Sequence, residues 1–293
     1  MKRGWRYWFN LLMVVIVFLL LLGLGGALAL SYHQTQLYLH PARWIASPLP
    51  LQEQGIDFQT VTLTTEDGLK LHAWYTPPQN GVVILVAHGH GSSIATDMYA
   101  LFARHGYGVL AWDFRAHGES EGEFTSLGYY EVRDVKAALD FALVQPEVEH
   151  VAGWGGSMGA VTMIRAAAQY SQIEAVVADS AFNTLSDELN LRVPIPGLRE
   201  LVRMWAQLQT GISVNSVRAV DDIGKISPRP IFIIQGMSDD NIPVESAQQL
   251  YDAAGEPRLL WTEPKAYHLN MHAKFPEKYE SRVIDFFDKV FGK

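Results

Sequence analysis

Ser157 lies in the segment VAGWGGSMGAV, residues 151–161, where a short apolar run meets a helix-like stretch. The residues GGSMG at 155–159 fit the pattern G-x-S-x-G, which builds a strained strand-to-helix turn that exposes the serine hydroxyl. Glycine at both ends lets the strand and the helix approach each other closely. The pattern predicts that Ser157 is a nucleophile, and a flexible glycine-rich turn is the alternative.

A serine nucleophile needs a general base, and the base needs an acid that orients it. Asp239 follows the apolar run IFII in the segment GMSDDNIP, and His268 follows the run LLW in PKAYHLNMH. In open α/β sheets, sites form at the carboxyl ends of such strands. We therefore expect Asp239 to be the acid and His268 the base, with Asp240 and His272 as the neighbouring alternatives.

The segment AHGHGSS, residues 87–93, follows the first apolar run, where donors for a tetrahedral oxyanion belong. We expect the backbone N–H groups of His90 and Met158 to form this oxyanion hole. The imidazoles of His88 and His90 are expected to have supporting roles. A metal site formed by His88, His90 and His117 is the alternative. Their spacing fits no common zinc pattern, so neither a metal nor a cofactor is expected.

The elements that must position these residues alternate regularly along the chain. Segments 58–65 and 70–76 alternate apolar and polar residues around EDG and predict an antiparallel hairpin. Continuous apolar runs, typical of parallel strands buried on both faces, occupy residues 82–87, 108–112, 151–154, 175–178, 231–234 and 259–261. Helical periodicity marks residues 96–106, 130–145, 243–255 and 278–292. The alternation predicts an α/β fold with a mostly parallel central sheet and helices on both faces.

One interval, residues 180–227, lacks a clear strand and is interpreted as a small helical cap. An apolar face at helical spacing is formed there by Leu198, Leu201, Val202, Trp205 and Leu208. This face either lines a substrate pocket or packs the cap onto the rest of the domain. The sequence leaves both interpretations open.

Residues 11–30 pass without a charge, which is about the length needed to cross a bilayer. The basic residues Lys2, Arg3 and Arg6 precede this run and predict a cytoplasmic N-terminus with the remainder outside. A cleaved signal peptide, which would yield a secreted protein, is the alternative. We favour the uncleaved anchor because the apolar run is longer than usual for a signal. The expected organisation is a cytoplasmic stub and membrane helix at 1–31, a connector at 32–57 and an α/β domain at 58–293.

The amino-acid composition excludes further classes of protein and of chemistry. The chain has 293 residues, of which 48% are hydrophobic, a net charge of −8 and no cysteine. The negative charge argues against a nucleic-acid partner. The absence of cysteine excludes disulfides and thiolate catalysis in this chain.

Several motifs together resemble the α/β-hydrolase superfamily, and most closely its serine aminopeptidase (S33)-type and monoacylglycerol lipase-like bacterial branch. The resemblance covers roughly residues 58–290 and is carried by VAHGHGSS, WDFRAHGESEG, GWGGSMGA, ADSAF, GMSDDNIP and YH. It implies the order Ser157, Asp239 and His268 for nucleophile, acid and base. Two positions depart from the usual pattern: Tyr267 replaces a glycine before the histidine, and Gln235 replaces a histidine at the start of the acid loop.

These observations predict a serine hydrolase that cleaves a small-molecule ester or another acyl bond through an acyl-enzyme. An aminopeptidase acting on peptide substrates is the alternative enzyme, and it would need an acidic group for the substrate amine. Candidates for that group in the cap interval are Asp187, Glu188, Asp221 and Asp222. A non-catalytic binding module with the same fold is the alternative from another class.

Overall fold

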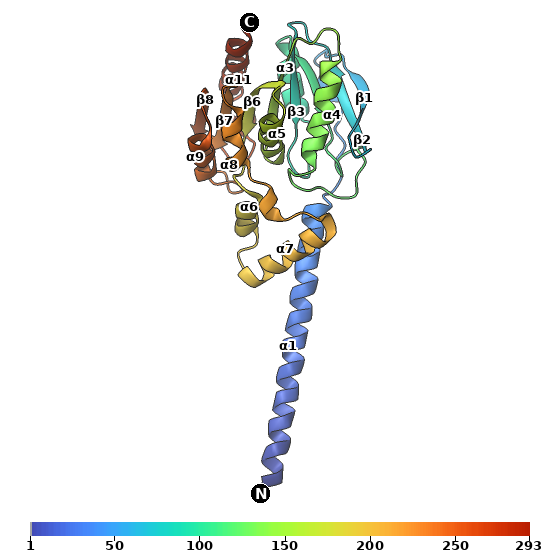
Figure 1. Cartoon of the computed structure of the whole chain (residues 1–293), viewed down its shortest axis with the longest axis vertical. Helices are drawn as coiled ribbons and strands as arrows, with labels where there is room; N and C mark the ends of the chain where they lie inside the picture. Colours follow the sequence, from blue (N-terminus) through green and yellow to red (C-terminus); the bar gives the residue numbers. More distant parts are fainter. Residues whose placement is uncertain (1) are drawn as a thin grey trace.

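The computed structural model describes residues 2–293, with side chains from Gly4 onward (Figure 1). Eight strands form one sheet: β1 (Gln59–Thr64), β2 (Lys70–Thr76), β3 (Val82–Ala87), β4 (Gly108–Trp112), β5 (His150–Gly156), β6 (Ile173–Asp179), β7 (Ile231–Gly236) and β8 (Arg258–Glu263). Their order in the sheet is β1-β2-β4-β3-β5-β6-β7-β8. The hairpin β1–β2 is antiparallel and joins β4 in antiparallel fashion, while β3 to β8 are mutually parallel. The predicted mostly parallel sheet is confirmed.

Helices cover both faces of this sheet because the central strands bury side chains on both sides. One core contains Val83 and Leu85 of β3 together with α4 (Glu131–Leu143), α5 (Met158–Gln169) and α9 (Val244–Ala253). The other core contains Ile84 and Val86 of β3 together with α3 (Thr96–Arg104) and α11 (Pro276–Phe291). Alternate residues of one strand thus pack against different helices, as expected for a continuous apolar run.

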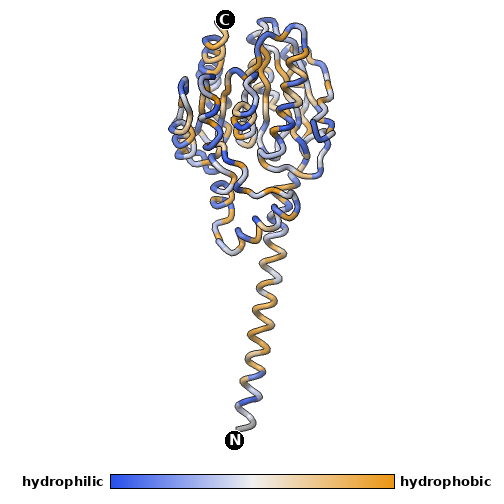
Figure 2. The backbone as a smooth tube through the Cα atoms, in the orientation of Figure 1, coloured by the Kyte–Doolittle hydropathy of each residue, from blue (hydrophilic) through white to orange (hydrophobic). Residues whose placement is uncertain are grey.

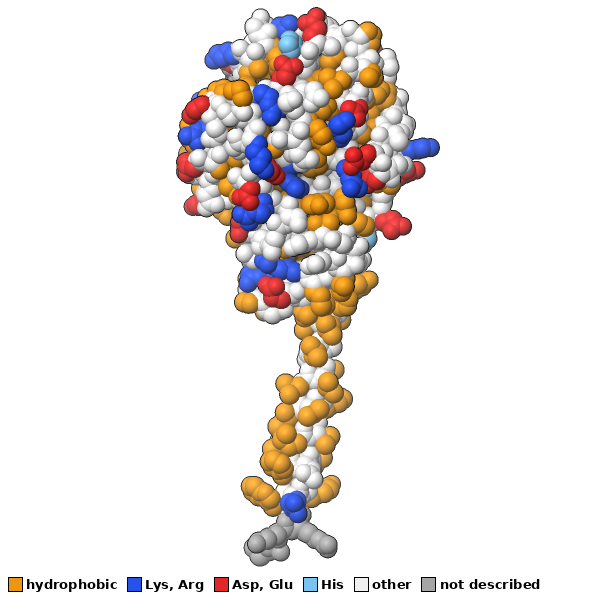
Figure 3. Space-filling model, viewed as in Figure 1, with side chains coloured by type: hydrophobic (Ala, Val, Ile, Leu, Met, Phe, Trp, Pro, Cys, Tyr) orange, Lys and Arg blue, Asp and Glu red, His pale blue; other side chains and the backbone are white. Residues whose placement is uncertain are grey.

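The N-terminal helix α1 (Lys2–Leu39) is longer than the apolar run that predicted it. It projects from the domain as a single rod, and its outer part carries apolar side chains on all sides (Figures 1, 2 and 3). By length and hydropathy, the segment Gly4–Leu39 could cross a membrane. The helix continues beyond Ser31 into the segment expected to be a connector. The side chains of Lys2 and Arg3, on which the predicted orientation partly rests, lie outside the described part of the chain.

The interval after β6 is helical, as predicted, and forms a cap over the carboxyl edge of the sheet. It contains α6 (Leu185–Arg192), α7 (Pro196–Thr210), η1 (Val214–Ser216), α8 (Ala219–Asp222) and η2 (Ile223–Ile226). Helix α7 crosses α1 at the base of the domain (Figure 1). The remaining short helices are α2 (Leu49–Gln52) and α10 (Met271–Lys274).

Trp205 of α7 decides how the cap is attached. Its indole Nε1 donates to Ser31 Oγ at 3.2 Å, and its ring meets Tyr32 edge-on with centroids 5.4 Å apart. Leu208, on the same apolar face, is 69% exposed. The predicted apolar face of α7 therefore does not line a pocket along its whole length. Trp205 packs the cap onto α1 at Ser31 and Tyr32, which follow the apolar run.

Candidate active site

Ser157 stands at the sharp turn between β5 and α5. Its φ of 54° is a left-handed backbone conformation, which is strained for a residue with a side chain. A Cβ added at Gly155 would collide with the backbone of Gly159, and one added at Gly159 would collide with the backbone of Ala87. Both glycines are therefore required by close backbone approach. The Ser157 amide donates to the Asp179 carbonyl at 2.8 Å, which ties the turn to β6.

A chain of hydrogen bonds joins Ser157, His268 and Asp239. His268 follows β8, and its Nε2 lies 3.0 Å from Ser157 Oγ. The other ring nitrogen, Nδ1, lies 2.8 Å from Oδ2 of Asp239, which follows β7. With the ring proton on Nδ1, the ring donates to Asp239 and accepts the Ser157 hydroxyl proton at Nε2. This arrangement can transfer a proton away from the serine oxygen.

Asp239 is held in place by several donors. Its Oδ1 accepts from the amides of Asn241 and Ile242 at 2.8 and 2.9 Å, and its Oδ2 accepts from Gln235 Nε2 at 2.8 Å. Burial pushes the pKa of Asp239 upward, but the hydrogen bonds from His268 and these amides outweigh it and hold the pKa below its usual value. The carboxylate therefore stays ionised and can orient the imidazole.

The structure does not bring the two alternative residues to Ser157. Asp240 is exposed. Nδ1 of His272 lies 3.5 Å from Oδ2 of Asp97, and 23% of the His272 side chain is exposed.

The expected oxyanion loop lies against Ser157. A Cβ added at Gly89 would be 3.4 Å from Ser157 Cβ, so the loop leaves room only for backbone there. Within residues 2–293, the amides of His90 and Met158 donate to no other protein group, and Met158 begins α5. Free amides beside a nucleophile, one of them at a helix N-terminus, suit a developing negative charge.

Two buried histidines fasten this loop to the loop after β4. Nε2 of His88 accepts from the Phe114 amide at 2.9 Å, and Nε2 of His117 accepts from the Gly91 amide at 3.1 Å. Burial lowers the pKa of both rings to about 4, so they are neutral at physiological pH. No three His, Asp or Glu side chains in the described part of the chain lie close enough to share a metal ion. His88 and His117 thus link the two loops by hydrogen bonds.

The chain is similar to several known proteins in sequence and in fold. The profile of the family described as serine aminopeptidase, S33, matches residues 77–218. The Bacillus subtilis protein YqkD is 28% identical over 220 residues, which are 71% of this chain and 71% of its own. The α/β-hydrolase domain-containing protein WAV2 of Arabidopsis thaliana is 22% identical over 304 residues, 94% of this chain and 96% of its own. A solved structure of the Pyrococcus furiosus esterase Pf2001 has a TM-score of 0.72 at 28% identity, covering 86% of this chain and 98% of that one.

The chain has the α/β-hydrolase fold and is similar to proteins of that superfamily. The fold predicted from the sequence and the resemblance carried by its motifs are both confirmed.

Two cavities open on Ser157 in this hydrolase. The first, here called the cap cavity, has a volume of about 160 Å³ and lies between α1, α6, α7 and the loop at 125–128. Its apolar lining includes Leu39, Met158, Leu185, Leu189, Val202 and Val214. The second, here called the loop cavity, has a volume of about 380 Å³ and lies on the His268 side, with Asp97, Asp179, His272 and Tyr279 in its lining. The cap cavity is thus mainly apolar, whereas the loop cavity combines polar with apolar side chains.

Asp179 is a buried carboxyl group in the loop cavity to which the sequence assigned no role. It accepts hydrogen bonds from Tyr279 Oη and from Ser180 Oγ, both at 2.9 Å. Burial raises the pKa of Asp179 to about 6, although these hydrogen bonds oppose the shift.

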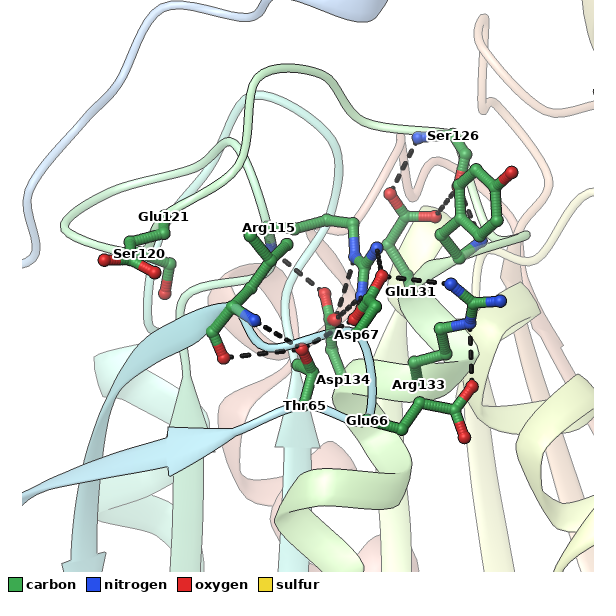
Figure 4. A network of polar contacts seen from close by, with 12 residues as sticks. Thr65, Glu66, Asp67, Arg115, Ser120, Glu121, Ser126, Glu131, Arg133 and Asp134 are labelled. Carbon is green, nitrogen blue, oxygen red and sulfur yellow. Dashed lines mark hydrogen bonds and ion pairs between the residues drawn. The ribbon is translucent and has the colours of Figure 1, made fainter. Parts of the chain in front are cut away.

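A buried network shapes the wall of the cap cavity (Figure 4). The Glu131 carboxylate is 0% exposed and accepts from Thr125 Oγ1, from the amide and hydroxyl of Ser126, and from the Gly128 amide at 2.6 to 2.8 Å. Beside it, Arg115 binds Asp134 at 2.6 Å. In the sequence, Glu131 looks like an ordinary acidic residue in the first turn of a helix. Its role becomes visible only in the folded chain, where the loop at 125–128 turns its donors toward the carboxylate.

Gln235 is the other residue whose role the sequence missed. It was noted only as a departure from the family's pattern, yet its amide donates to Asp239 and to the Ile242 carbonyl at 2.8 and 3.0 Å. The substitution keeps a hydrogen-bond donor beside the acid.

Proposed function

We propose that this hydrolase is a serine esterase that cleaves small-molecule acyl esters through an acyl-enzyme. The observation that carries the proposal is the hydrogen-bonded chain from Ser157 through His268 to Asp239. In the first step, His268 Nε2 takes the hydroxyl proton as Ser157 Oγ attacks the ester carbonyl. The amides of His90 and Met158 stabilise the oxyanion that forms.

The tetrahedral intermediate then collapses. The bond from the carbonyl carbon to the alkoxy oxygen breaks, and His268 gives its proton to the leaving alcohol. Water, deprotonated by the same ring, attacks the acyl-enzyme and releases the acid and the free serine. Asp239 stabilises the imidazolium in both halves and holds the ring in the tautomer that the first step requires.

The lining of the two cavities suggests how the ester lies. The apolar cap cavity suits the acyl chain, because each buried methylene contributes about 0.8 kcal/mol. The loop cavity suits the leaving alcohol, since polar side chains in its lining include Asp179, Tyr279 and the His272–Asp97 pair. The likeness to the Pyrococcus furiosus esterase supports ester rather than amide cleavage.

An aminopeptidase remains the second candidate, because the matched family profile carries that name. Of the four acidic candidates in the cap interval, only Glu188 lines the cap cavity, and it is paired with Arg192 at 2.7 Å. Asp187 binds Thr184 at the start of α6, while Asp221 and Asp222 pair with basic neighbours. No free carboxylate from this set therefore faces Ser157 to receive a substrate amine.

We further propose that α1 is an uncleaved membrane anchor, with the N-terminus in the cytoplasm and the catalytic domain outside. The length and hydropathy of the helix support the anchor, and Arg6, with the two basic residues before it, supports the orientation. The packing of Ser31 and Tyr32 on α7 adds to the case, because cleavage near residue 29 would free the end of that packed segment.

The test is active-site labelling together with a substrate panel. Ser157→Ala should abolish labelling by a fluorophosphonate probe without lowering the melting temperature, whereas Ser281→Ala, on the outer helix α11, should label as the wild type does. Acetyl and hexanoyl esters should be turned over and aminoacyl amides should not. Stoichiometric labelling of Ser157→Ala would refute the nucleophile, and faster turnover of aminoacyl amides would favour the peptidase.

A further inference from the structure

The last turns of α1 reach the site. Thr35, Tyr38 and Leu39 line the cap cavity together with Ser157. Nε2 of His90 donates to the Tyr38 carbonyl at 2.8 Å, so the ring of the oxyanion loop binds the backbone of α1. The Thr125 amide donates to the Leu39 carbonyl at 2.9 Å, which joins the opposite cavity wall to the same helix.

The position of α1 is also set from the cap. Gln36 Nε2 donates to Gln209 Oε1 at 2.7 Å, one turn beyond the contacts of Ser31 and Tyr32 with Trp205. Helix α1 therefore touches α7 over more than one turn and the catalytic loops at its end. Because α1 is held both by α7 and by the catalytic loops, the part of α1 that lines the cap cavity has a defined shape. A binding site for a flexible acyl chain requires such a shape.

The same helix carries the apolar run, and no break separates the two parts. Thr35 and Leu39 follow Leu30 by five and nine residues, which places them about 8 and 14 Å further along the axis at 1.5 Å per residue. The polar layer of a bilayer extends about 5–7 Å beyond each side of its hydrocarbon core. With the run in the membrane, the cap cavity lies directly above the headgroups.

We propose that the end of α1 is the specificity-determining wall of the acyl site, and that the substrate is a single-chain acyl ester taken up at the membrane surface. This inference rests on the proposed esterase function. A cavity of about 160 Å³ is close in size to an engineered apolar cavity of about 150 Å³ that binds benzene. The enclosed part therefore holds about six carbons, and Leu39 lies in its wall.

The test compares Leu39 with Leu37, a leucine of the same helix that is 53% exposed and does not line the cavity. Full-length protein in phosphatidylcholine vesicles is assayed on nitrophenyl esters from acetyl to decanoyl. Leu39→Trp fills the cavity, so the preferred chain should shorten by about two carbons. The hexanoyl-to-acetyl ratio of kcat/KM should then fall about 15-fold, at about fourfold per methylene. Leu39→Ala should move the preferred length the other way, and the Leu37 variants should keep the wild-type profile.

Opposite shifts from filling and emptying one position are not produced by general destabilisation, which would lower all chain lengths together. The inference is overturned if both Leu39 variants keep the wild-type chain-length optimum, or if the Leu37 variants shift it equally. If Leu39→Trp does not fold, as judged by its melting temperature, Leu39→Ala alone decides. Acetyl hydrolysis that persists in Ser157→Ala would overturn the esterase function itself, which is a separate outcome.

Uptake from the membrane is tested by surface dilution. A decanoyl ester is dissolved in the vesicles that hold the protein, and phosphatidylcholine is added at constant bulk ester concentration. The rate should fall in proportion to the mole fraction of ester in the bilayer. A rate that does not change on dilution would refute uptake at the membrane surface.

Discussion

Replacing His88 by glutamine should flatten the dependence of stability on pH. The imidazole is 2% exposed; Nδ1 donates to the Gly89 carbonyl at 2.7 Å, and Nε2 accepts from the Phe114 amide at 2.9 Å. Protonation of Nε2 would place one N–H against another. Burial, more than any nearby group, lowers the pKa of His88 from 6.5 to about 4.

The size of the stability change follows from the difference in the pKa of His88 between the folded and the unfolded chain. Above pH 6.5 the ring is neutral in the folded and in the unfolded chain, so the stability that depends on its neutrality is fully present. As the pH falls from 6.5 to about 4, the unfolded chain takes up a proton that the folded chain refuses, and this stability is lost. The loss amounts to about 3 kcal/mol, at about 1.4 kcal/mol per pKa unit.

The assay is the melting temperature of the full chain in detergent micelles between pH 7.5 and pH 4. For a domain of this size, about 3 kcal/mol corresponds to about 6–12 °C. His88→Gln should melt lower than the wild type at pH 7.5, because it loses packing, but should lose about 6–12 °C less on acidification. His33→Gln, which removes an exposed imidazole of α1, should follow the wild-type curve.

Burial, and after it the charge of His88, lowers the pKa of the neighbouring His117, so removing His88 should flatten the pH dependence of stability a little further. His117 lies 5.1 Å from His88 between ring centroids, and His90 and Glu131 also act on its charge. Asp179 has the opposite effect: its raised pKa adds stability that is lost as the pH rises from 3.8 to about 6. Parallel pH curves for wild type and His88→Gln would refute the reasoning.

Three further predictions concern the acid, the cavity wall and the anchor. Asp239→Asn should lower kcat for the acetyl ester by about 10⁴, as loss of tautomer control does in a serine triad, whereas Asp240→Asn should retain most activity; equal losses would contradict the assignment. Glu131→Gln should lower the melting temperature by about 4–8 °C, because an amide group would face amide and hydroxyl donors, and an unchanged melting temperature would show that the loop does not depend on the charge. Protease added outside spheroplasts should digest the chain beyond Ser31; full protection would reverse the orientation, and a soluble form beginning near Leu30 would indicate a cleaved signal peptide.

Local patterns were sufficient for the sheet and for the set of candidate residues. The parallel strands β3 to β7 contain short apolar runs, because burial on both faces leaves little polar alternation to interrupt them. The glycines around Ser157 are equally local, since the turn needs residues without side chains where backbones cross. Asp239 and His268 could be singled out because each follows such a strand at its carboxyl end, and parallel strands bring those ends to one edge.

The partners of exposed and amphipathic segments could be decided only by the tertiary structure. Helical spacing identified the apolar face of α7, but the period does not say which surface covers it, and Trp205 packs on α1 while Val202 lines the cavity. Likewise, the composition of residues 32–39 is compatible with a connector. They are helical because Gln36 binds α7 and the Tyr38 and Leu39 carbonyls accept from loops far away in the sequence.

The sequence by itself therefore determined the strands of the sheet and predicted which residues after them do chemistry, because those signals lie within a few neighbouring residues. What shapes the cap cavity was decided by contacts between distant segments: the end of α1, the loop held by Glu131, and the cap helices. Such contacts depend on which surfaces pack together in the folded chain. A single sequence shows which segments have an apolar surface, but it does not show which of these surfaces contact one another.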